Sequence, residues 1–481
     1  MQNKVTIFWF RQDLRISDNP GLFEAAKQGM VIPVYILNEK FNHALHVDNA
    51  SQCWLQISLQ KLNESLGHKL NVYAGNPKQV LLEIIKNNQA HAVYWNRCYE
   101  PSRIKEDADI KKLLKEMQVE CKSFNGSLLR EPWDILKSDG LPYKVYTPFC
   151  KKGYLQHEPP RHPIPAPAKL TLMKASPSSL TLANMNLMTE KIWCEKIKKT
   201  WDIGELAAQK KLDDFLENGL LDYKEYRNYP GKKNVSRLSA HLHFGEISPN
   251  QMWHSAQAKG LSESWLRDLD CFFSELVWRE FAYYLLYHFP DFPEKNFQEK
   301  FDRFPWECSH TLLNAWKKGK TGYPIVDAGM RELWQTGYMH NRVRMVVASF
   351  LVKNLLQHWH HGAAWFSHCL VDADLASNSI SWQWVAGSGV DAAPYFRIFN
   401  PTTQGETFDP EGKYTRQFVP ELSGMPDKFL FKPWDAPEKV LNSAGVILGS
   451  TYPKPIVDLK ITRERALKAY KMISNQETGT I

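Results

Sequence analysis

The sequence predicts two domains of different class, an α/β domain with a Rossmann-like parallel sheet at the N-terminus and an all-helical domain at the C-terminus. Over residues 1–130, short apolar runs alternate with helical patterns, which is typical of a parallel sheet. Beyond Trp201, apolar residues recur at helical spacing. Residues 157–167 contain too many prolines for helix or sheet. We expect an α/β domain over residues 1–135, an interdomain linker over 136–200 and a helical domain over 201–475.

The expected elements of the first domain alternate along the chain. Apolar runs predict strands at residues 5–10, 31–36, 70–73, 92–95 and 119–124. Helices are expected at residues 22–27, 50–66, 77–87 and 103–117. In the second domain they are expected at residues 206–218, 248–260, 265–288, 309–318 and 326–358. No G-x-G-x-x-G follows the first strand, so an ordinary dinucleotide site is not expected there.

Composition describes an ordinary globular chain with two unusual features. The formal net charge is +8, which is compatible with a nucleic-acid partner. The 17 tryptophans suit stacking surfaces or electron relays, although large helical cores also use them. The eight cysteines form no C-x-x-C pair, so free thiols are expected and neither a zinc site nor a disulfide framework. No apolar run reaches the ~20 residues of a membrane span, and we expect a cytoplasmic monomer without membrane contact.

The stretch at residues 359–404 concentrates acids, amides and indoles. Asp372, Asp374 and Asn378 are followed by Trp382 and Trp384, in a segment without a clean helical or strand period. Polar groups beside flat aromatic surfaces suit a planar ligand with polar edges, such as a flavin or a base. The alternative is a polar-capped core segment, whose buried polar groups would need partners of their own.

Three further motifs point to ligand chemistry, each with a plainer alternative. Ser236-Arg-Leu-Ser239 can cradle an anion with hydroxyl and backbone N–H groups, or can simply cap a helix. Glu275, Trp278 and Arg279 share one helical face, which also suits an amphipathic helix with a surface ion pair. The histidines between residues 358 and 361 cannot share one helical face and lack an acid or cysteine partner, so no metal site is expected.

From Trp9-Phe-Arg-Gln-Asp-Leu-Arg-Ile-Ser-Asp-Asn19 to Phe399-Asn-Pro-Thr-Thr-Gln-Gly405, the chain resembles the photolyase/cryptochrome flavoproteins, most closely the class I cyclobutane pyrimidine dimer photolyases. The resemblance implies an FAD-binding helical domain and light-driven DNA repair, in which excited reduced FAD gives an electron to the dimer. It also implies an antenna chromophore in the first domain. The sequence leaves this open between methenyltetrahydrofolate, 8-hydroxy-5-deazaflavin, a second flavin and none. The segment at residues 95–101 could contact the antenna or be only a structured loop.

The resemblance also implies the residues around FAD. The expected cofactor contacts are Tyr223, Val235, Ser236, Arg237, Leu238, Ser239, Phe272, Glu275, Arg279, Arg344, Asp372, Ala373, Asp374 and Asn378. Val235 replaces a threonine that is usual in the family, which removes one hydroxyl contact. Arg344 could pair with Asp372, and Asn378 stands at the position that faces flavin N5. Trp382, Trp359 and Trp306 correspond to the family's electron-transfer chain, although a single tryptophan without the resemblance is more often a core indole.

The residues expected to meet the DNA lesion also follow from the resemblance, and they are Arg227, Glu275, Trp278, Asn341, Arg342, Met345, Trp384 and Gln404. Glu275 would have to be protonated to hydrogen-bond the dimer and stabilise its radical anion. The (6-4) photolyases and animal cryptochromes carry histidines at the positions of Asn341 and Met345, so this pair favours dimer repair. A cryptochrome-like photoreceptor without repair activity is the alternative, and the absence of a long C-terminal tail weighs against it.

Overall fold

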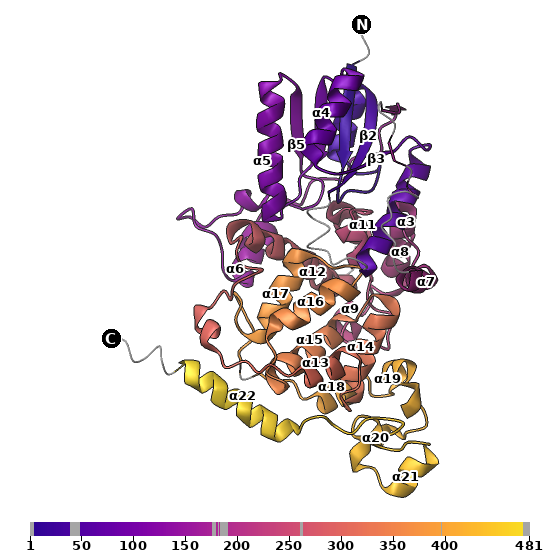
Figure 1. Cartoon of the computed structure of the whole chain (residues 1–481), viewed down its shortest axis with the longest axis vertical. Coiled ribbons are helices and arrows are strands. Elements are labelled where there is room, and N and C mark those ends of the chain that lie inside the picture. Colours follow the sequence, from indigo (N-terminus) through magenta and orange to yellow (C-terminus); the bar gives the residue numbers. More distant parts are fainter. Residues whose placement is uncertain are drawn as a thin grey trace, which may run out of the picture. The chain divides into compact units, whose positions relative to one another are not determined.

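The computed structural model describes residues 4–38, 49–175, 179, 180, 182, 191–259, 263–395 and 397–474 (Figure 1). Its chain forms two compact units. The first unit combines Met1–Leu221, Ser236–Pro290 and Val371–Ala376. The second unit combines Asp222–Val235, Asp291–Leu370 and Ser377–Ile481. Both units therefore contain segments that are far apart in the sequence.

The first unit contains the predicted parallel sheet. Its main strands lie in the order β3-β2-β1-β4-β5, and their bounds are β1 (Lys4–Phe10), β2 (Gly29–Leu37), β3 (Asn71–Ala74), β4 (Ala92–Asn96) and β5 (Glu120–Phe124). All neighbouring strands are parallel. The helices between them are α1 (Pro20–Gln28), α3 (Ala50–Ser65), α4 (Pro77–Asn88) and α5 (Pro101–Glu116), and Figure 1 shows α4 and α5 alongside the strands. The predicted α/β class is confirmed.

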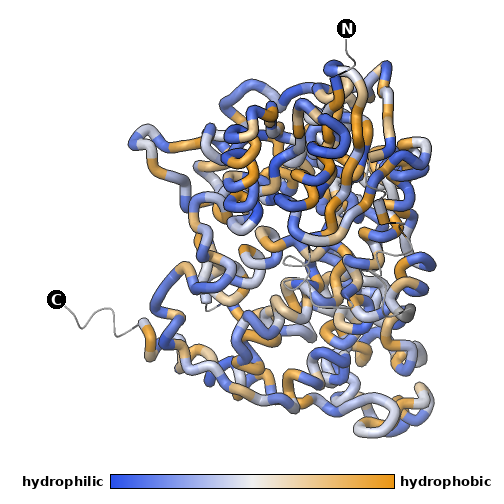
Figure 2. The backbone as a smooth tube through the Cα atoms, turned by 45° about the horizontal axis from the view of Figure 1, so that its top comes forward, coloured by the Kyte–Doolittle hydropathy of each residue, from blue (hydrophilic) through white to orange (hydrophobic). Residues whose placement is uncertain are grey.

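The strands are apolar on both faces because helices cover the sheet. Ile7, Ile32, Val34 and Val93 are all 0% exposed within one core cluster. Figure 2 shows the hydrophobic stretches running along these strands. A parallel strand buried on both faces reads as a continuous apolar run rather than an alternating one. This packing explains why unbroken apolar runs in the sequence predicted the positions of the strands.

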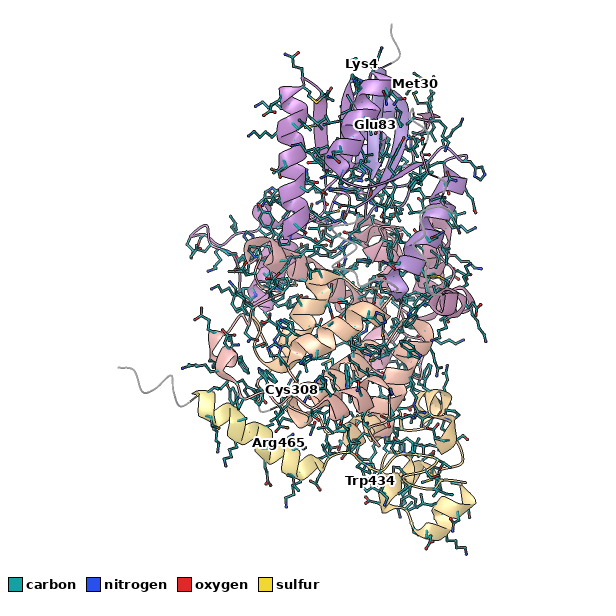
Figure 3. The ribbon with its side chains drawn as sticks, in the orientation of Figure 1. Lys4, Met30, Glu83, Cys308, Trp434 and Arg465 are labelled. Atoms are coloured by element: carbon teal, nitrogen blue, oxygen red, sulfur yellow. A yellow bond between two sulfur atoms is a disulfide. The ribbon has the colours of Figure 1, made fainter. Side chains whose placement is uncertain are left out.

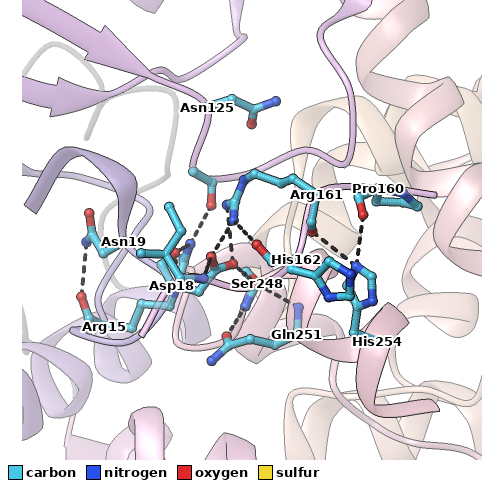
Figure 4. Close-up of polar contacts among 12 residues, drawn as sticks. Arg15, Asp18, Asn19, Asn125, Pro160, Arg161, His162, Ser248, Gln251 and His254 are labelled. Atoms are coloured by element: carbon cyan, nitrogen blue, oxygen red, sulfur yellow. Dashed lines mark hydrogen bonds and ion pairs between the residues drawn. The ribbon is translucent and has the colours of Figure 1, made fainter. Parts of the chain in front are cut away.

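The proline-rich segment is tied to the first unit by a buried carboxylate. Asp18 accepts hydrogen bonds from the Ile164 N–H at 2.9 Å, from Arg161 Nη1 at 2.5 Å and from the Ser248 hydroxyl (Figure 4). His254 Nε2 bonds the Pro160 carbonyl oxygen at 2.9 Å. Residues 157–167 form neither helix nor strand, as predicted. The expected linker region also forms β6 (Thr171–Leu172), which pairs with β2, and the helical segments α6 (Tyr146–Cys150), η2 (Lys151–Leu155) and α7 (Lys191–Thr200).

The remainder of the chain is helical, as predicted. Up to residue 386 the helices are α8 (Glu205–Asn218), α9 (Tyr223–Tyr226), α10 (Ser239–His243), α11 (Pro249–Lys259), α12 (Glu263–His288), α13 (His310–Lys317), α14 (Pro324–Thr336), α15 (Asn341–Ser349), α16 (Trp359–Cys369) and α17 (Leu375–Ala386). Beyond it lie α18 (Pro401–Phe408), α19 (Lys413–Phe418), α20 (Asp427–Leu430), α21 (Glu438–Ser443) and α22 (Leu459–Ser474). Arg465 of α22, labelled in Figure 3, bonds Glu307 at 2.8 Å and the Asn354 carbonyl oxygen at 2.6 Å.

One prediction about these helices is wrong, and α17 was not predicted. The single helix expected at residues 326–358 ends at Thr336, because Gly337 adopts a left-handed φ of 70° that terminates a helix. His340 then caps α15, accepting a hydrogen bond from the Arg342 N–H at 3.2 Å. The segment that contains Trp382 and Trp384, which showed no clean helical or strand period, forms α17, most of whose residues are buried or half-buried. A helix that is buried on most sides has no single apolar stripe, so its period is hidden.

The expectation that all cysteines are free is also wrong. Cys53 of α3 and Cys194 of α7 form a disulfide with a Cα–Cα distance of 5.5 Å. The two residues are 141 positions apart in the sequence. No spacing motif reveals a pair this distant, because the fold alone brings the two helices together. The described helices include none that is both long and apolar enough to cross a membrane.

Lys353 gives a prediction about the pH dependence of stability. It is 1% exposed, and Nζ donates to the Arg397 carbonyl oxygen at 2.8 Å. Burial, helped by Arg397, lowers the pKa of Lys353 from 10.5 to about 7. Between these values the unfolded chain binds a proton that the folded chain does not, so stability rises with pH through this window. We expect Lys353→Met to stabilise the protein at pH 7 by on the order of a few kcal/mol.

Thermal unfolding at pH 6.5 and pH 9.5 checks this prediction. The gain in Tm of Lys353→Met over the wild type should shrink as pH approaches 10. Lys468→Met, at an exposed lysine of α22, should change Tm little at either pH. An equal gain at both pH values would show that ionisation of Lys353 is not the cause.

Candidate functional site

The predicted site residues are divided between the two compact units, and each group is described within its own unit. The first unit holds Ser236, Arg237, Leu238, Ser239, Phe272, Glu275, Trp278, Arg279, Asp372, Ala373 and Asp374. The second unit holds Tyr223, Arg227, Val235, Trp306, Asn341, Arg342, Arg344, Met345, Trp359, Asn378, Trp382, Trp384 and Gln404.

The segment Ser236–Ser239 has the backbone shape of an anion site. Arg237 has a left-handed φ of 52°, and the next residue, Leu238, has φ −93°. Alternation of left- and right-handed residues turns successive N–H groups towards one concavity, which binds anions. The Leu238 N–H reaches Ser236 Oγ at 3.4 Å, and the Arg237 guanidinium lies 4.6 Å from the centre of the Trp201 ring. A left-handed non-glycine residue at this point favours a binding role over a plain helix cap.

Helix α12 carries four predicted residues, and the side chains of Phe272 and Arg279 have contacts that fix them within the first unit. Phe272 is 3% exposed and packs on Phe215 with ring centroids 5.1 Å apart. Arg279 Nη1 donates to the Ser127 carbonyl oxygen at 2.8 Å and lies 3.3 Å from a carboxylate oxygen of Glu280. Glu275 and Trp278 are half-buried. Their side chains, unlike that of Phe272, are therefore partly exposed at the surface of this unit.

The segment Asp372–Asp374 connects to two neighbouring side chains. Asp374 accepts a hydrogen bond from the Tyr283 hydroxyl, and its Oδ2 lies 3.5 Å from His243 Nδ1. Burial, and then the charge of Asp374, raise the pKa of Tyr283 well above its usual value. Tyr283 therefore remains a proton donor to Asp374. This bond fixes the orientation of the carboxylate.

In the second unit, Arg227 and Arg342 form a basic pair. Arg342 Nη2 donates to the Asn228 side-chain oxygen at 2.9 Å, and its guanidinium lies 4.4 Å from the centre of the Phe408 ring. Burial, together with the like charge of Arg227, lowers the pKa of Arg342 below its usual value. These described contacts of Arg342 are uncharged, so a phosphate would relieve the repulsion between the two arginines.

Helix α15 presents Asn341 and Met345 on one face, since the two residues are one helical turn apart. Asn341 is exposed and Met345 is half-buried. Arg344 Nε donates to the carbonyl oxygen of Met339, in the preceding loop, at 2.7 Å. Gln404, on α18, has a buried Oε1 without a hydrogen-bond partner among the described residues.

Asn378 has its amide orientation set by helix α16. Its Nδ2 donates to the Ala363 carbonyl oxygen at 3.0 Å and to Ser367 Oγ at 3.1 Å. Both amide hydrogens are used in this way, so Oδ1 is the atom left to meet a ligand. Asn378 can therefore serve only as an acceptor towards a flavin.

The three tryptophans of the predicted electron chain lie in the second unit. Trp382 is 2% exposed and contacts Phe366 with ring centroids 5.0 Å apart. Trp359 is 1% exposed, and its Nε1 donates to the Asn296 side-chain oxygen at 2.9 Å. The imidazole of His358 contacts both Trp359 and Trp306, with ring centroids 5.7 Å and 5.1 Å apart respectively. This imidazole links the two indole rings in a way that the sequence did not suggest.

The first unit contains a second group of polar atoms, at the carboxyl ends of β1 and β4. Asp107 accepts hydrogen bonds from Arg11 Nη1 at 2.6 Å and from Trp95 Nε1 at 2.8 Å. Trp9 Nε1 and Glu100 Oε2 are buried without a partner among the described residues. Ligands bind outside the carboxyl ends of strands in open parallel sheets. This group is the structural candidate for an antenna contact.

Several side chains that shape these sites were missed by sequence reasoning. Asn228 and Phe408 hold Arg342, Tyr146 stacks on Trp278, and Gly362 faces Trp382. Most of these partners lie in other segments of the chain, so no local pattern could have found them. Gly362 gave a local signal, because a glycine inside a helical pattern marks a close approach.

The concave backbone at Ser236–Ser239 in the first unit, and separately the oriented Asn378 amide and the buried indoles in the second, are each compatible with a flavin nucleotide, and comparison with known families agrees. Residues 272–472 match the family described as the FAD binding domain of DNA photolyase. Residues 6–168 match the family described as DNA photolyase. The chain belongs to the photolyase/cryptochrome family.

Relatives and solved structures support the family over the whole chain. A deoxyribodipyrimidine photo-lyase of Agrobacterium fabrum is 47% identical over 473 residues, covering 97% of this chain and 98% of the relative. Cryptochrome-2 of Arabidopsis thaliana is 37% identical, covering 97% of this chain and 79% of the relative. A crystal structure of a class III photolyase from Agrobacterium tumefaciens has a TM-score of 0.94 and 45% identity, and covers 99% of this chain and 98% of that one. The similarity to class III corrects the expected class I subclass.

Proposed function

We propose that the protein is a light-driven DNA repair enzyme of the class III photolyase type that splits cyclobutane pyrimidine dimers. The observation that carries this proposal is the start of helix α15. There the exposed Asn341 is adjacent in sequence to Arg342, whose guanidinium is held beside Arg227. A residue for the lesion and one arginine of the pair for the DNA backbone are thus neighbours at the start of α15, and Arg227, at the end of α9, supplies the second arginine.

The described residues fit FAD. Ser236–Ser239 would hold the diphosphate through its concave backbone, and Tyr223, Val235, Phe272, Arg279, Arg344 and Asp372–Asp374 would complete the contacts. Oδ1 of Asn378 would accept a hydrogen bond from the flavin ring, since its Nδ2 is used by α16. When bound and reduced, FAD supplies the electron that splits the dimer. Trp382, Trp359 and Trp306 would carry electrons from the surface to keep it reduced.

DNA would bind first through phosphate contacts with Arg227 and Arg342. Gln404, on the same helix α18 as the Phe408 ring that contacts Arg342, would also touch the DNA. The damaged pair would then leave the stack; photolyases are among the general examples of base-flipping enzymes. Glu275, Trp278, Asn341, Met345 and Trp384 would hold the lesion. A distorted dimer is cheaper to extrude than intact bases, which gives selectivity without reading sequence.

The first domain would hold an antenna chromophore at the polar group around Trp9 and Glu100. Two buried polar atoms that lack described partners favour a ligand at this point. Methenyltetrahydrofolate and 8-hydroxy-5-deazaflavin are both planar chromophores with hydrogen-bonding edges, and release of the bound pigment by denaturation would identify it.

We further propose a monomer in the cytoplasm, with domain limits near residues 135 and 200.

A cryptochrome-like photoreceptor is the second candidate, favoured by the 37% identity to Cryptochrome-2. It would use the same flavin and tryptophans without repairing DNA. Lesion binding separates the two functions, because only the repair enzyme needs Asn341 to recognise a dimer.

Replacing Asn341 by Ala should weaken binding to dimer-containing DNA about tenfold, because one hydrogen bond to the lesion is lost. Affinity for undamaged DNA and the flavin absorbance should stay unchanged. Titration in the dark at one fixed salt concentration measures both affinities. Asn314→Ala, at an exposed asparagine of α13, is the matched control and should bind as the wild type does. Unchanged affinity of Asn341→Ala for the dimer would contradict the assignment.

A further inference from the structure

Tyr146 lies flat against Trp278, one of the two half-buried residues that α12 contributes to the proposed lesion site. The ring centroids are 3.7 Å apart and the ring planes differ by 4°. The two rings are therefore in van der Waals contact over most of a face. Tyr146 begins α6, in the region that the sequence predicted to be only a linker.

The position of Tyr146 is fixed at two points. Its hydroxyl donates to the Ser274 carbonyl oxygen at 2.9 Å, which ties the ring to α12. One turn later, Phe149 is 0% exposed and packs against Phe281 at 5.0 Å and Tyr284 at 4.7 Å by ring centroids. These contacts anchor α6 on α12. The ring of Tyr146 thus has little freedom to leave Trp278.

Phe281 sets the tilt of the stacked pair. It meets Tyr146 and Trp278 edge-on, with ring centroids 5.9 Å away in both cases and interplanar angles of 69° and 72°. Phe281 is itself 0% exposed. Because the buried Phe281 ring contacts both Tyr146 and Trp278, it keeps their two rings parallel. The plane of the indole is therefore defined before any ligand binds.

Tyr146 also lies close to the second lesion residue of α12. Burial raises the pKa of the Tyr146 phenol above its ordinary value, and the Glu275 carboxyl contributes to this rise. Ser274, which receives the hydroxyl bond, is the residue before Glu275. Tyr146 therefore stacks on Trp278 and is bonded to the residue that precedes Glu275.

We propose that Tyr146 is a positioning residue for the lesion: it covers one face of the Trp278 indole and leaves only the opposite face to stack on the pyrimidine dimer. The proposal rests on the dimer-repair function proposed above. An indole held on one side cannot rotate away from an entering base, so lesion stacking needs no ordering of Trp278. Tyr146 acts through Trp278 and not by touching the reacting atoms.

The test measures dark binding to a dimer-containing oligonucleotide and to its undamaged counterpart, with flavin-loaded protein at one salt concentration. Tyr146→Leu should weaken dimer binding about five- to tenfold and leave undamaged DNA unaffected. Tyr146→Phe, which keeps the ring, should stay within about twofold of the wild type. Tyr287→Leu is the matched control, because it removes a tyrosine ring from another part of α12. That ring packs on Trp133, with ring centroids 5.4 Å apart, and not on Trp278.

A double variant separates positioning from general destabilisation. If Tyr146 acts through Trp278, Tyr146→Leu in a Trp278→Ala background should cause no further loss of dimer affinity. Additive losses, equal losses for damaged and undamaged DNA, or wild-type binding by Tyr146→Leu would each overturn the proposal. If the leucine variant does not fold, Tyr146→Met keeps the apolar bulk without the flat ring and gives the same test. A wild type that does not prefer the dimer would instead overturn the repair function, and the proposal with it.

Discussion

Replacing Gly362 by Ala is expected to displace Trp382 and to slow light-driven reduction of bound FAD by about tenfold to a hundredfold. Gly362 lies on α16, one turn after Trp359. A Cβ at this position would stand 2.0 Å from Cη2 and 2.4 Å from Cζ3 of Trp382. The obstacle is a ring that is 2% exposed, so it cannot swing into solvent. Either the helix or the indole must move, at a cost of ~1–3 kcal/mol.

A compensating variant supplies the control for this prediction. Phenylalanine in place of Trp382 lacks both atoms that meet the new methyl group. Thermal unfolding should therefore show that Gly362→Ala destabilises the Trp382→Phe protein much less than it destabilises the wild type. Flavin photoreduction under fixed illumination measures the functional loss of the single variant. Equal destabilisation in both backgrounds would show that contact with Trp382 is not the cause.

The second large effect concerns DNA affinity. Removing both Arg227 and Arg342 by alanine substitution should lower affinity for damaged and undamaged DNA by the same factor, on the order of a hundredfold at low salt. Their proximity without a described anionic partner for Arg342 suits two phosphate contacts. Each phosphate contact contributes about 0.9 to the slope of log affinity against log salt, so the slope should fall by about 2.

Titrations at several salt concentrations measure this slope. The matched control is Lys460→Ala with Lys468→Ala, which removes the same charge from two exposed lysines of α22. The control should change the slope little. An arginine variant that loses only dimer binding, or keeps the full slope, would contradict the role of this pair.

How much of the fold the sequence predicts depends on burial. Strands β1 and β2 could be predicted because both faces are covered, so their apolar runs at residues 5–10 and 31–36 are unbroken. Helix α17 could not, because burial on most sides removes the apolar stripe that marks a helix. The sequence did contain a signal for the break at Gly337, namely a glycine followed three residues later by His340, which can cap a helix. The apolar spacing on both sides of this position nevertheless favoured one continuous helix.

The site shows a similar limit. The resemblance supplied Trp278, Arg342 and Trp382 one by one, because each belongs to a recognisable local motif. The groups that orient them come from distant segments: Tyr146 precedes Trp278 by more than a hundred residues, and Phe408 follows Arg342 by more than sixty. Such contacts, like the Cys53–Cys194 disulfide, are decided by tertiary packing alone.

Light-dependent repair is the most direct test of dimer splitting. Flavin-loaded, reduced protein would be illuminated with an oligonucleotide that carries one thymine cyclobutane dimer. A (6-4) lesion oligonucleotide and dark samples of both would be run in parallel. We predict that intact thymines return only in the light and only from the cyclobutane dimer. Photoreduction of the flavin without repair of either lesion would contradict the repair function and place the protein with the photoreceptors.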